Sequence, residues 1–192
     1  MRPASGGGVR RCAGMDDPTA HRFADDGRFP NSPLPLLAYR RALPPDPAAI
    51  ERVFAAHDWS NGWQNGIFGF HHFHSTAHEA LGIAAGTVRV MLGGPAGEEL
   101  TLHAGDAVVI PAGVAHRNMG QSADLLVVGA YPGGAGYDTR RGDSAEHAAA
   151  LRAIAALPVP GHDPVLGRDR GLRRLWLHTG RPGPGGAGRG AF

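Results

Sequence analysis

The stretch GIFGFHHFHSTAHEALGIAAG, residues 66–86, places four histidines and one glutamate in the nine positions 71–79, although the whole chain holds eleven histidines. Imidazole and carboxylate groups bind first-row metal ions and exchange protons near neutral pH, so this crowding indicates a chemical site. The plainer alternative is a polar surface loop. The spacing of the residues helps to decide between the two.

Two spacings bring the polar residues together. Side chains two positions apart in a strand point to the same face, so His72 and His74 are expected to point together into a barrel. Glu79 lies far enough along the chain to return on the next strand after a tight turn. A second stretch, GDAVVIPAGVAH at residues 105–116, predicts a turn, a buried strand and another turn that brings His116 towards the same interior.

Length and composition describe a globular protein with one domain and a substantial core. The chain has 192 residues, of which 42% are hydrophobic and 19% charged. No apolar run approaches the ~18 residues of a membrane span, so no membrane is expected as a partner. All 19 basic residues are arginines, which excludes Schiff-base chemistry and lysine-anchored pyridoxal phosphate.

The basic residues lie mostly in the flanks. Residues 66–137 contain two arginines, Arg89 and Arg117, and no nucleic-acid reading motif is visible. Binding through phosphates requires a clustered basic face, so no nucleic-acid partner is expected.

The single cysteine, Cys12, permits neither a disulfide framework nor a cysteine-ligated zinc site. The positively charged start is not followed by an apolar stretch, which argues against a secretory signal and favours a cytoplasmic location. Met15 is an alternative to Met1 as the true start.

The segments before and after the central region, residues 59–132, differ from it in composition and in hydrophobic pattern. Residues 1–28 lack periodicity and are predicted to be a disordered lead. Residues 29–45 carry five prolines and are predicted to form an extended arm. A short helix is expected after the N-cap Asp46. A second is expected after Asp143, which would form a capping box with Glu146, and Pro158 would end it. Residues 179–192 have the composition of a flexible Gly/Pro-rich tail.

Between Trp59 and Pro132 the chain shows short apolar runs separated by glycine, which is typical of the strands of an antiparallel barrel or sandwich. The runs TVRVML and ELTLHAG alternate with a two-residue period, so each is expected to have an inner and an outer face.

The spaced positions resemble the two motifs of the cupin superfamily. Residues 66–86 hold all five fixed positions of the first motif, and residues 105–120 hold four of the five of the second. Gly120 stands where the terminal asparagine is usual, with Asn118 two residues earlier. Around this core, FPNSPLPLL, WSNGWQNGIFGF and DPVLG before LRRLW resemble the small bacterial YjlB-like cupins, from Phe29 to Trp176.

The resemblance implies an all-β fold. We expect a cupin-type double-stranded β-helix, or jelly-roll barrel, with an extended N-terminal arm and two flanking helices. A single cupin domain would cover residues 29–178, with its motif core at 66–132. A small one-domain barrel exposes sheet edges, and the arm is suited to covering an edge or the face of a second copy, so a homodimer is also expected.

The resemblance also implies a set of metal ligands, His72, His74, Glu79 and His116, for a divalent transition metal ion such as Fe, Mn, Ni or Zn. Such a ligand set leaves two open positions in an octahedral sphere. The alternative is a degenerate cupin whose histidines pack in the core. His78 is the candidate catalytic residue, as a hydrogen-bond partner of a ligand or as a proton relay, unless it is a surface residue.

The leading hypothesis is therefore a metal-dependent enzyme that acts on a small molecule. Iron would suit an oxygenase, and manganese, nickel or zinc an isomerase or lyase. The alternative hypothesis is a non-catalytic cupin that binds a small ligand such as a sugar or an organic acid.

Overall fold

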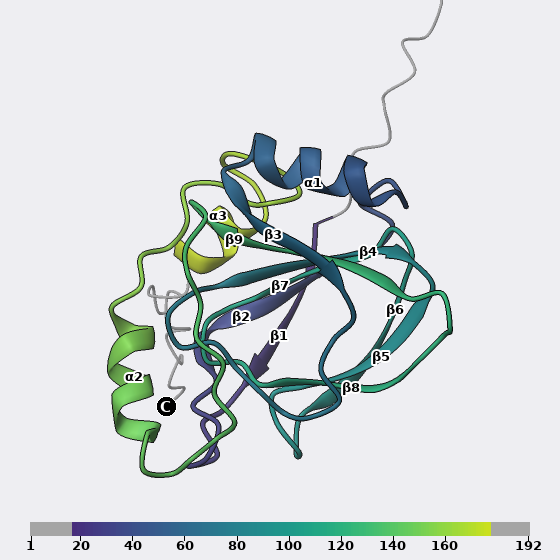
Figure 1. Cartoon of the computed structure of the whole chain (residues 1–192). Helices are drawn as coiled ribbons and strands as arrows, with labels where there is room; N and C mark the ends of the chain where they lie inside the picture. Colours follow the sequence, from purple (N-terminus) through teal and green to yellow (C-terminus); the bar gives the residue numbers. More distant parts are fainter. Residues whose placement is uncertain (1–16, 178–192) are drawn as a thin grey trace, which may run out of the picture.

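A computed structural model describes residues 17–177 of the chain, which are rich in strands (Figure 1). The strands are β1 (Thr19–Phe23), β2 (Ser32–Tyr39), β3 (Trp59–Asn65), β4 (Glu79–Ala85), β5 (Thr87–Leu92), β6 (Glu98–His103), β7 (Ala107–Ile110), β8 (His116–Gln121) and β9 (Leu126–Pro132). The helices are α1 (Pro47–Ala56), α2 (His147–Ala155) and α3 (Leu172–Leu177).

The strands form two antiparallel sheets that face each other (Figure 1). The larger sheet has the order β1-β2-β7-β4-β9-β3, and the smaller has the order β6-β5-β8. This arrangement confirms the predicted mostly β, antiparallel fold. Within residues 17–177 no strand ladder joins the two sheets, so the strands make two facing layers, and the jelly-roll barrel stays a prediction.

A small hydrophobic cluster packs against α2, and two larger cores lie on the two faces of the larger sheet. One lies between the two sheets and includes Leu81 of β4, Val90 of β5 and Leu102 of β6. The other lies on the outer face of the larger sheet, where Phe54 of α1 and Trp176 of α3 pack. The larger sheet is therefore covered on both faces, which explains why β4 and β7 read as continuous apolar runs.

The smaller sheet shows the alternation predicted from its sequence. In β5 the side chains of Val88, Val90 and Leu92 are buried, while Arg89 between them is exposed. Strand β6 pairs with β5 along its whole length, from Thr87 opposite His103 to Leu92 opposite Glu98. Buried and exposed side chains alternate in β6 with the same two-residue period. One face of this sheet therefore contributes to the core and the other meets solvent.

Two motif glycines adopt backbone conformations that other residues rarely take. Gly86 between β4 and β5 has φ +73°, and a Cβ there would lie 2.8 Å from the backbone of Leu125. Gly113 has φ +94°, and a Cβ would lie 2.2 Å from the carbonyl oxygen of Asn31. A side chain at either position would strain the turns that place Glu79 and His116.

The N-terminal part of the chain corrects two predictions. The disorder predicted for residues 1–28 does not hold for Thr19–Phe23, which form β1, and residues 1–16 lie outside the described residues. The expected arm is a strand: Ser32–Tyr39 form β2, which lies inside the larger sheet between β1 and β7. Because β2 pairs within its own sheet, it does not supply the arm on which the expected homodimer rested, and the homodimer stays a prediction.

The segment that carries His72 and His74 also differs from expectation. Both residues were predicted to lie on a strand, but 66–78 forms no strand and makes only isolated bridges, between His72 and His116 and between Phe73 and Arg140. The glycines and small polar residues of this segment favour an irregular path, which wraps across the end of β8 instead of extending a sheet.

Both predicted flanking helices are present. The Asp46 side chain caps α1 by accepting a hydrogen bond from the Ala49 N–H, as the sequence predicted. At α2 the expected capping box is absent, because Glu146 makes no side-chain cap and instead pairs with Arg140. A third, short helix, α3, is present in addition to the two predicted ones. No helix among the described residues is long and apolar enough to cross a membrane. The tail predicted for 179–192 lies outside the described residues.

Candidate metal centre

Three buried histidines converge between the two sheets. One ring nitrogen from each of His72, His74 and His116 lies within 4.8 Å of the others. The backbones of His72 and His116 exchange two hydrogen bonds, His72 N–H to His116 O at 3.1 Å and His116 N–H to His72 O at 2.9 Å. This bridge ties the irregular segment 66–78 to the start of β8, so the backbone itself sets the distance between the two rings.

The hydrogen bonds of the three rings leave the same nitrogen free in each. The Nδ1 atom of His72 lies 3.2 Å from the Phe70 carbonyl oxygen, and that of His116 lies 3.3 Å from the Val114 carbonyl oxygen. The Nδ1 atom of His74 contacts the carbonyl oxygen of Asp138. A carbonyl can only accept, so each Nδ1 carries a proton. In the neutral ring the lone pair then lies on Nε2, which is the state in which histidine binds a metal ion.

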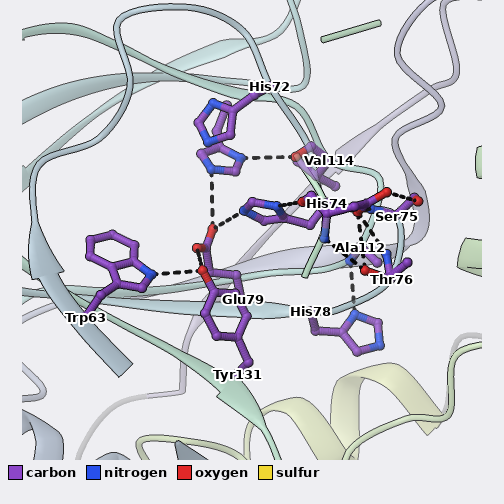
Figure 2. Close-up of polar contacts among 12 residues, drawn as sticks. Trp63, His72, His74, Ser75, Thr76, His78, Glu79, Ala112, Val114 and Tyr131 are labelled. Carbon is purple, nitrogen blue, oxygen red and sulfur yellow. Dashed lines mark hydrogen bonds and ion pairs between the residues drawn. The ribbon is translucent and has the colours of Figure 1, made fainter. Parts of the chain in front are cut away.

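Glu79, the first residue of β4, directs its carboxylate at this cluster (Figure 2). Its Oε2 atom lies 3.4 Å from His74 Nε2 and 3.3 Å from His116 Nε2. Oε2 is fully buried and has no hydrogen-bond partner among the described residues, and the side chain as a whole is only 3% exposed. Burying a carboxylate oxygen next to the lone pairs of ring nitrogens costs free energy unless a cation lies between them. This set of donor atoms therefore fits a metal ion.

The pKa values at the cluster follow from burial and from the carboxylate. Burial, helped by the neighbouring His116, lowers the pKa of His72 to about 3, which keeps its imidazole neutral. Burial alone would lower the pKa of His74, but the Glu79 carboxylate outweighs it and raises that pKa. Burial would likewise raise the pKa of Glu79, but His116 and His74 hold it well below its usual range. Glu79 is therefore ionised near neutral pH.

Two aromatic residues hold the other oxygen of this carboxylate. The Tyr131 hydroxyl at the end of β9 donates to Glu79 Oε1 at 2.7 Å, and the Trp63 indole N–H donates to the Tyr131 oxygen at 2.8 Å (Figure 2). Gly129 leaves room for the indole, because a Cβ there would lie 2.1 Å from a Trp63 ring carbon. The chain from Trp63 through Tyr131 orients Glu79 so that Oε2 faces the histidines.

Asp138 orients His74 through its main chain and fastens the loop that carries it. Its carboxylate accepts hydrogen bonds from Ser75 N–H and Ser75 Oγ–H, both at 2.6 Å, and from Arg140 Nε–H at 2.6 Å. Burial would raise the pKa of Asp138, but these hydrogen bonds and the arginine lower it. The ionised side chain of Asp138 therefore fixes the loop, and this keeps the main-chain carbonyl of the same residue against the His74 ring.

His78 does not share the cluster. Its Nδ1 atom accepts a hydrogen bond of 3.0 Å from the Ala112 N–H, and its ring packs 4.8 Å from the Trp176 ring, centre to centre. Figure 2 shows the ring pointing away from the Glu79 carboxylate. Burial lowers the pKa of His78 to about 4, so the ring is neutral and buried in the other core. The role predicted for His78 in catalysis stays a prediction, and its geometry provides no direct path to the cluster.

A cavity of about 690 Å³ opens onto the cluster. His72, His74, Glu79 and His116 form its polar end, and aromatic, aliphatic and amide side chains form the rest. This volume falls in the usual range for sites that bind small molecules.

Sequence reasoning thus brought together the four proposed ligands but missed the residues that orient them. Tyr131 lies in the apolar run of β9, and Asp138 lies in a glycine-rich loop; neither stretch carries a motif. Their contacts depend on how strands pair: Ala80 faces Ala130 across β4 and β9, which puts Tyr131 beside Glu79. That pairing could not be read from local spacing.

Comparison with known sequences shows the family of the chain. A family model described as a cupin domain matches residues 63–129. The uncharacterized protein YjlB of Bacillus subtilis (strain 168) is 41% identical over 156 residues, which cover 81% of this chain and 94% of that protein.

Solved structures match smaller parts of the chain. An acireductone dioxygenase from Bacillus anthracis with a cadmium ion in its active centre is 20% identical, with a TM-score of 0.33, over 43% of this chain and 56% of that one. The oxalate decarboxylase of Lactobacillus farciminis in a formate complex is 16% identical, with a TM-score of 0.31, over 56% of this chain and 25% of that one.

Proposed function

Since the chain belongs to the YjlB-like cupins, we propose that it is a metal-dependent enzyme whose divalent transition metal ion is held by His72, His74, His116 and Glu79. Its substrate would be a small molecule bound in the cavity above these residues. The first three ligands would contribute neutral imidazoles and the fourth a carboxylate, which leaves a divalent ion with a net positive charge.

The observation that carries this proposal is the common orientation of the three imidazoles. Each Nδ1 faces a main-chain carbonyl, so the three Nε2 lone pairs face inward before any ion arrives. Histidines that merely pack in a core have no reason to share one tautomer or to surround an unpartnered carboxylate oxygen. Such a preorganised set of donors favours metal binding over the degenerate cupin that the sequence left open.

The bound ion would act as a Lewis acid on an oxygen of the substrate. The chain's own residues provide the rest: Glu79 reduces the charge of the site, and Tyr131 holds Glu79 in place. Ile67 and Leu81 line the cavity with apolar surface, which limits the number of water molecules near the ion. The cavity wall therefore supplies positioning and exclusion of water, and the ion supplies activation.

A specific observation also supports the second candidate, a non-catalytic binder. Apart from the four proposed ligands, no described residue that lines the cavity is an aspartate, glutamate, histidine or arginine. Tyr131 does line it, but burial raises its pKa far above neutrality and its hydroxyl is engaged with Glu79. An enzyme of this design would have to move protons through the hydroxyl of Tyr137, which also lines the cavity, through the ligands or through the substrate itself.

Elemental analysis of protein purified without a metal-binding tag tests the proposal. We expect about one equivalent of a divalent transition metal ion per chain, because four convergent donors form one site. Metal content near zero, together with no uptake of Mn, Fe, Ni or Zn ions by the metal-free protein, would overturn it. With the Mn-loaded protein, water-proton relaxation distinguishes an ion with an exchangeable water, which a substrate can replace, from a fully enclosed ion.

A further inference from the structure

We infer that the ligand of the cavity is a small hydroxylated molecule, such as a sugar or a sugar acid, with at most one anionic group, which meets the metal ion. The inference rests on the proposed metal site and goes beyond it by naming the chemical class of the ligand. Three features of the cavity carry it: the distribution of charge, the amide groups at the mouth and the aromatic surfaces beside them.

The groups of the cavity that can carry a charge near neutral pH all lie at one end. They are the three histidines and Glu79; the two tyrosines of the wall carry phenol groups, which are uncharged near neutral pH, and none of the described residues on the rest of the wall is a cation. A divalent ion with one carboxylate ligand keeps one net positive charge, which one anionic group of a ligand neutralises. A second anionic group would lie against a wall that offers it no partner, at a cost in free energy.

Two arginines in the loop that follows Asp138 are engaged elsewhere. Arg140 pairs with Asp138 at 2.6 Å and with Glu146 at 2.9 Å. The Arg141 guanidinium lies over the Phe70 ring, 4.0 Å from its centre. Neither residue lines the cavity. A site built for phosphate or for a dicarboxylate would instead direct at least one guanidinium into the cavity.

The mouth of the cavity offers uncharged hydrogen-bonding groups. Asn65 and Gln121 line it from the ends of β3 and β8, and both side chains are exposed. The Asn65 carbonyl accepts from Gly66 N–H, and the Gln121 carbonyl accepts from the Asn118 amide. Each side-chain carbonyl thus already accepts one hydrogen bond, so the amide N–H groups are the donors that these exposed side chains offer to a ligand. Hydroxyl and carbonyl oxygens are the natural acceptors for such donors.

Two aromatic rings line the same cavity as these amides. Phe68 is 53% exposed and Tyr137 is 43% exposed, although both are large and partly apolar. Each ring is held by a neighbour: Phe68 stacks on Phe70 and Tyr137 stacks on Tyr131. Rings that are fixed yet exposed at a cavity mouth suit the C–H face of a carbohydrate, while the amides bind its hydroxyl groups.

Three six-carbon probes test the inference on the full-length protein loaded with zinc. Gluconate carries one carboxylate and five hydroxyl groups, glucarate adds a second carboxylate at the far end, and hexanoate has one carboxylate and no hydroxyl. In calorimetric titrations we expect gluconate to bind about tenfold more tightly than either of the others. Only gluconate combines one carboxylate for the metal ion with uncharged hydroxyl groups along the rest of the wall. Glucarate binding as tightly as gluconate, hexanoate binding as tightly as gluconate, or no binding by gluconate would each overturn the inference.

A charge-gain variant gives an independent test. Gln121→Arg puts a cation into the wall and should bring the affinity for glucarate to at least that for gluconate, whereas Thr101→Arg, at an exposed site on β6 that does not line the cavity, should leave the order unchanged. An unchanged order in both variants would overturn the role of the neutral wall.

Metal content, measured before and after each titration, separates this inference from the proposed function. A protein that holds no zinc overturns the metal site and this inference with it. A zinc-loaded protein that prefers glucarate overturns only the inference.

Discussion

The main-chain carbonyl of Asp138 accepts the hydrogen bond of His74 Nδ1 across 64 residues of sequence. The same residue uses its carboxylate to hold Ser75, the neighbour of that histidine. One residue therefore sets both the position of the backbone around His74 and the tautomer of its ring. Residues that orient a metal ligand in this way typically influence affinity without touching the ion.

The first prediction follows from this relationship. Asp138→Asn removes the charge that attracts Arg140 and one acceptor of the Ser75 contacts, so the loop should release the His74 ring. We expect metal affinity to fall by about 10- to 100-fold while the protein stays folded. Competition with a chromophoric chelator measures the change. Asp143→Asn, at an exposed position in the same loop region, is the matched control and should bind metal like the parent protein.

The second prediction concerns the hydroxyl of Tyr131. Tyr131→Phe leaves Glu79 Oε1 without its donor and the Trp63 indole N–H without its acceptor, in a buried place. We expect the free energy of unfolding to fall by about 1–3 kcal/mol, and metal affinity to fall with it because Glu79 can turn.

The control for this change is Tyr137→Phe, which removes a hydroxyl from the ring stacked on Tyr131. Urea unfolding and metal titration of the two variants should differ clearly. If both variants kept the stability and the metal affinity of the parent protein, the hydrogen-bonded chain from Trp63 to Glu79 would have no role in the site.

The third prediction is a pH dependence of the metal-free protein. The pKa of His78 falls from an ordinary 6.5 to about 4 in the folded chain, because burial disfavours the charged ring. The unfolded chain therefore binds a proton at a higher pH than the folded chain does. The stability contribution of the neutral ring is complete above pH 6.5 and is lost as the pH falls towards 4, at up to about 1.4 kcal/mol per pH unit.

The variant His78→Asn isolates this contribution. Its amide oxygen can still accept from the Ala112 N–H, but the side chain does not titrate. Urea unfolding at pH 7 and pH 5 should show a smaller loss of stability on acidification than in the parent protein, by about 1–2 kcal/mol. His72, whose pKa is also lowered, is present in both proteins and cancels in the comparison. An equal loss in both proteins would show that His78 is not a buried neutral ring.

The proposed ligands could be predicted from sequence because their positions depend on local turns. Gly86 and Gly113 each permit a turn that few other residues allow: Gly86 follows the strand that begins at Glu79, and Gly113 precedes the strand that begins at His116. Spacing along the chain therefore translates into position in space. For the same reason the strands β5, β6 and β7 could be recognised from their alternation or their apolar runs.

What the sequence did not reveal depends on contacts between distant segments. The proline-rich segment at β2 was expected to lie outside the fold, yet Leu37 pairs with Val109 of β7 in the middle of a sheet. Nothing in either segment specifies the other, since both are simply apolar and extended. The irregular path through His72 and His74 has the same origin, because a bridge to His116 replaces the strand pairing that alternation alone would predict.

The last prediction compares two adjacent residues, Glu79 and His78, which the sequence could not assign with certainty to the inside of the site. The structure places the Glu79 carboxylate 3.3 Å from His116 Nε2, while the His78 ring lies against Trp176 in the other core. Glu79→Gln removes the anionic donor that offsets part of the charge of the ion. It should therefore weaken metal binding by more than the ~100-fold limit typical of residues that only orient a ligand.

His78→Ala should behave in the opposite way. It removes a buried ring and leaves the Ala112 N–H without its acceptor, so we expect a loss of about 2–4 kcal/mol in the free energy of unfolding, with metal affinity nearly unchanged. Metal titration and urea unfolding of both variants separate the two roles. Strong metal binding by Glu79→Gln, with loss of metal by a folded His78→Ala protein, would show that His78 and not Glu79 is the fourth ligand.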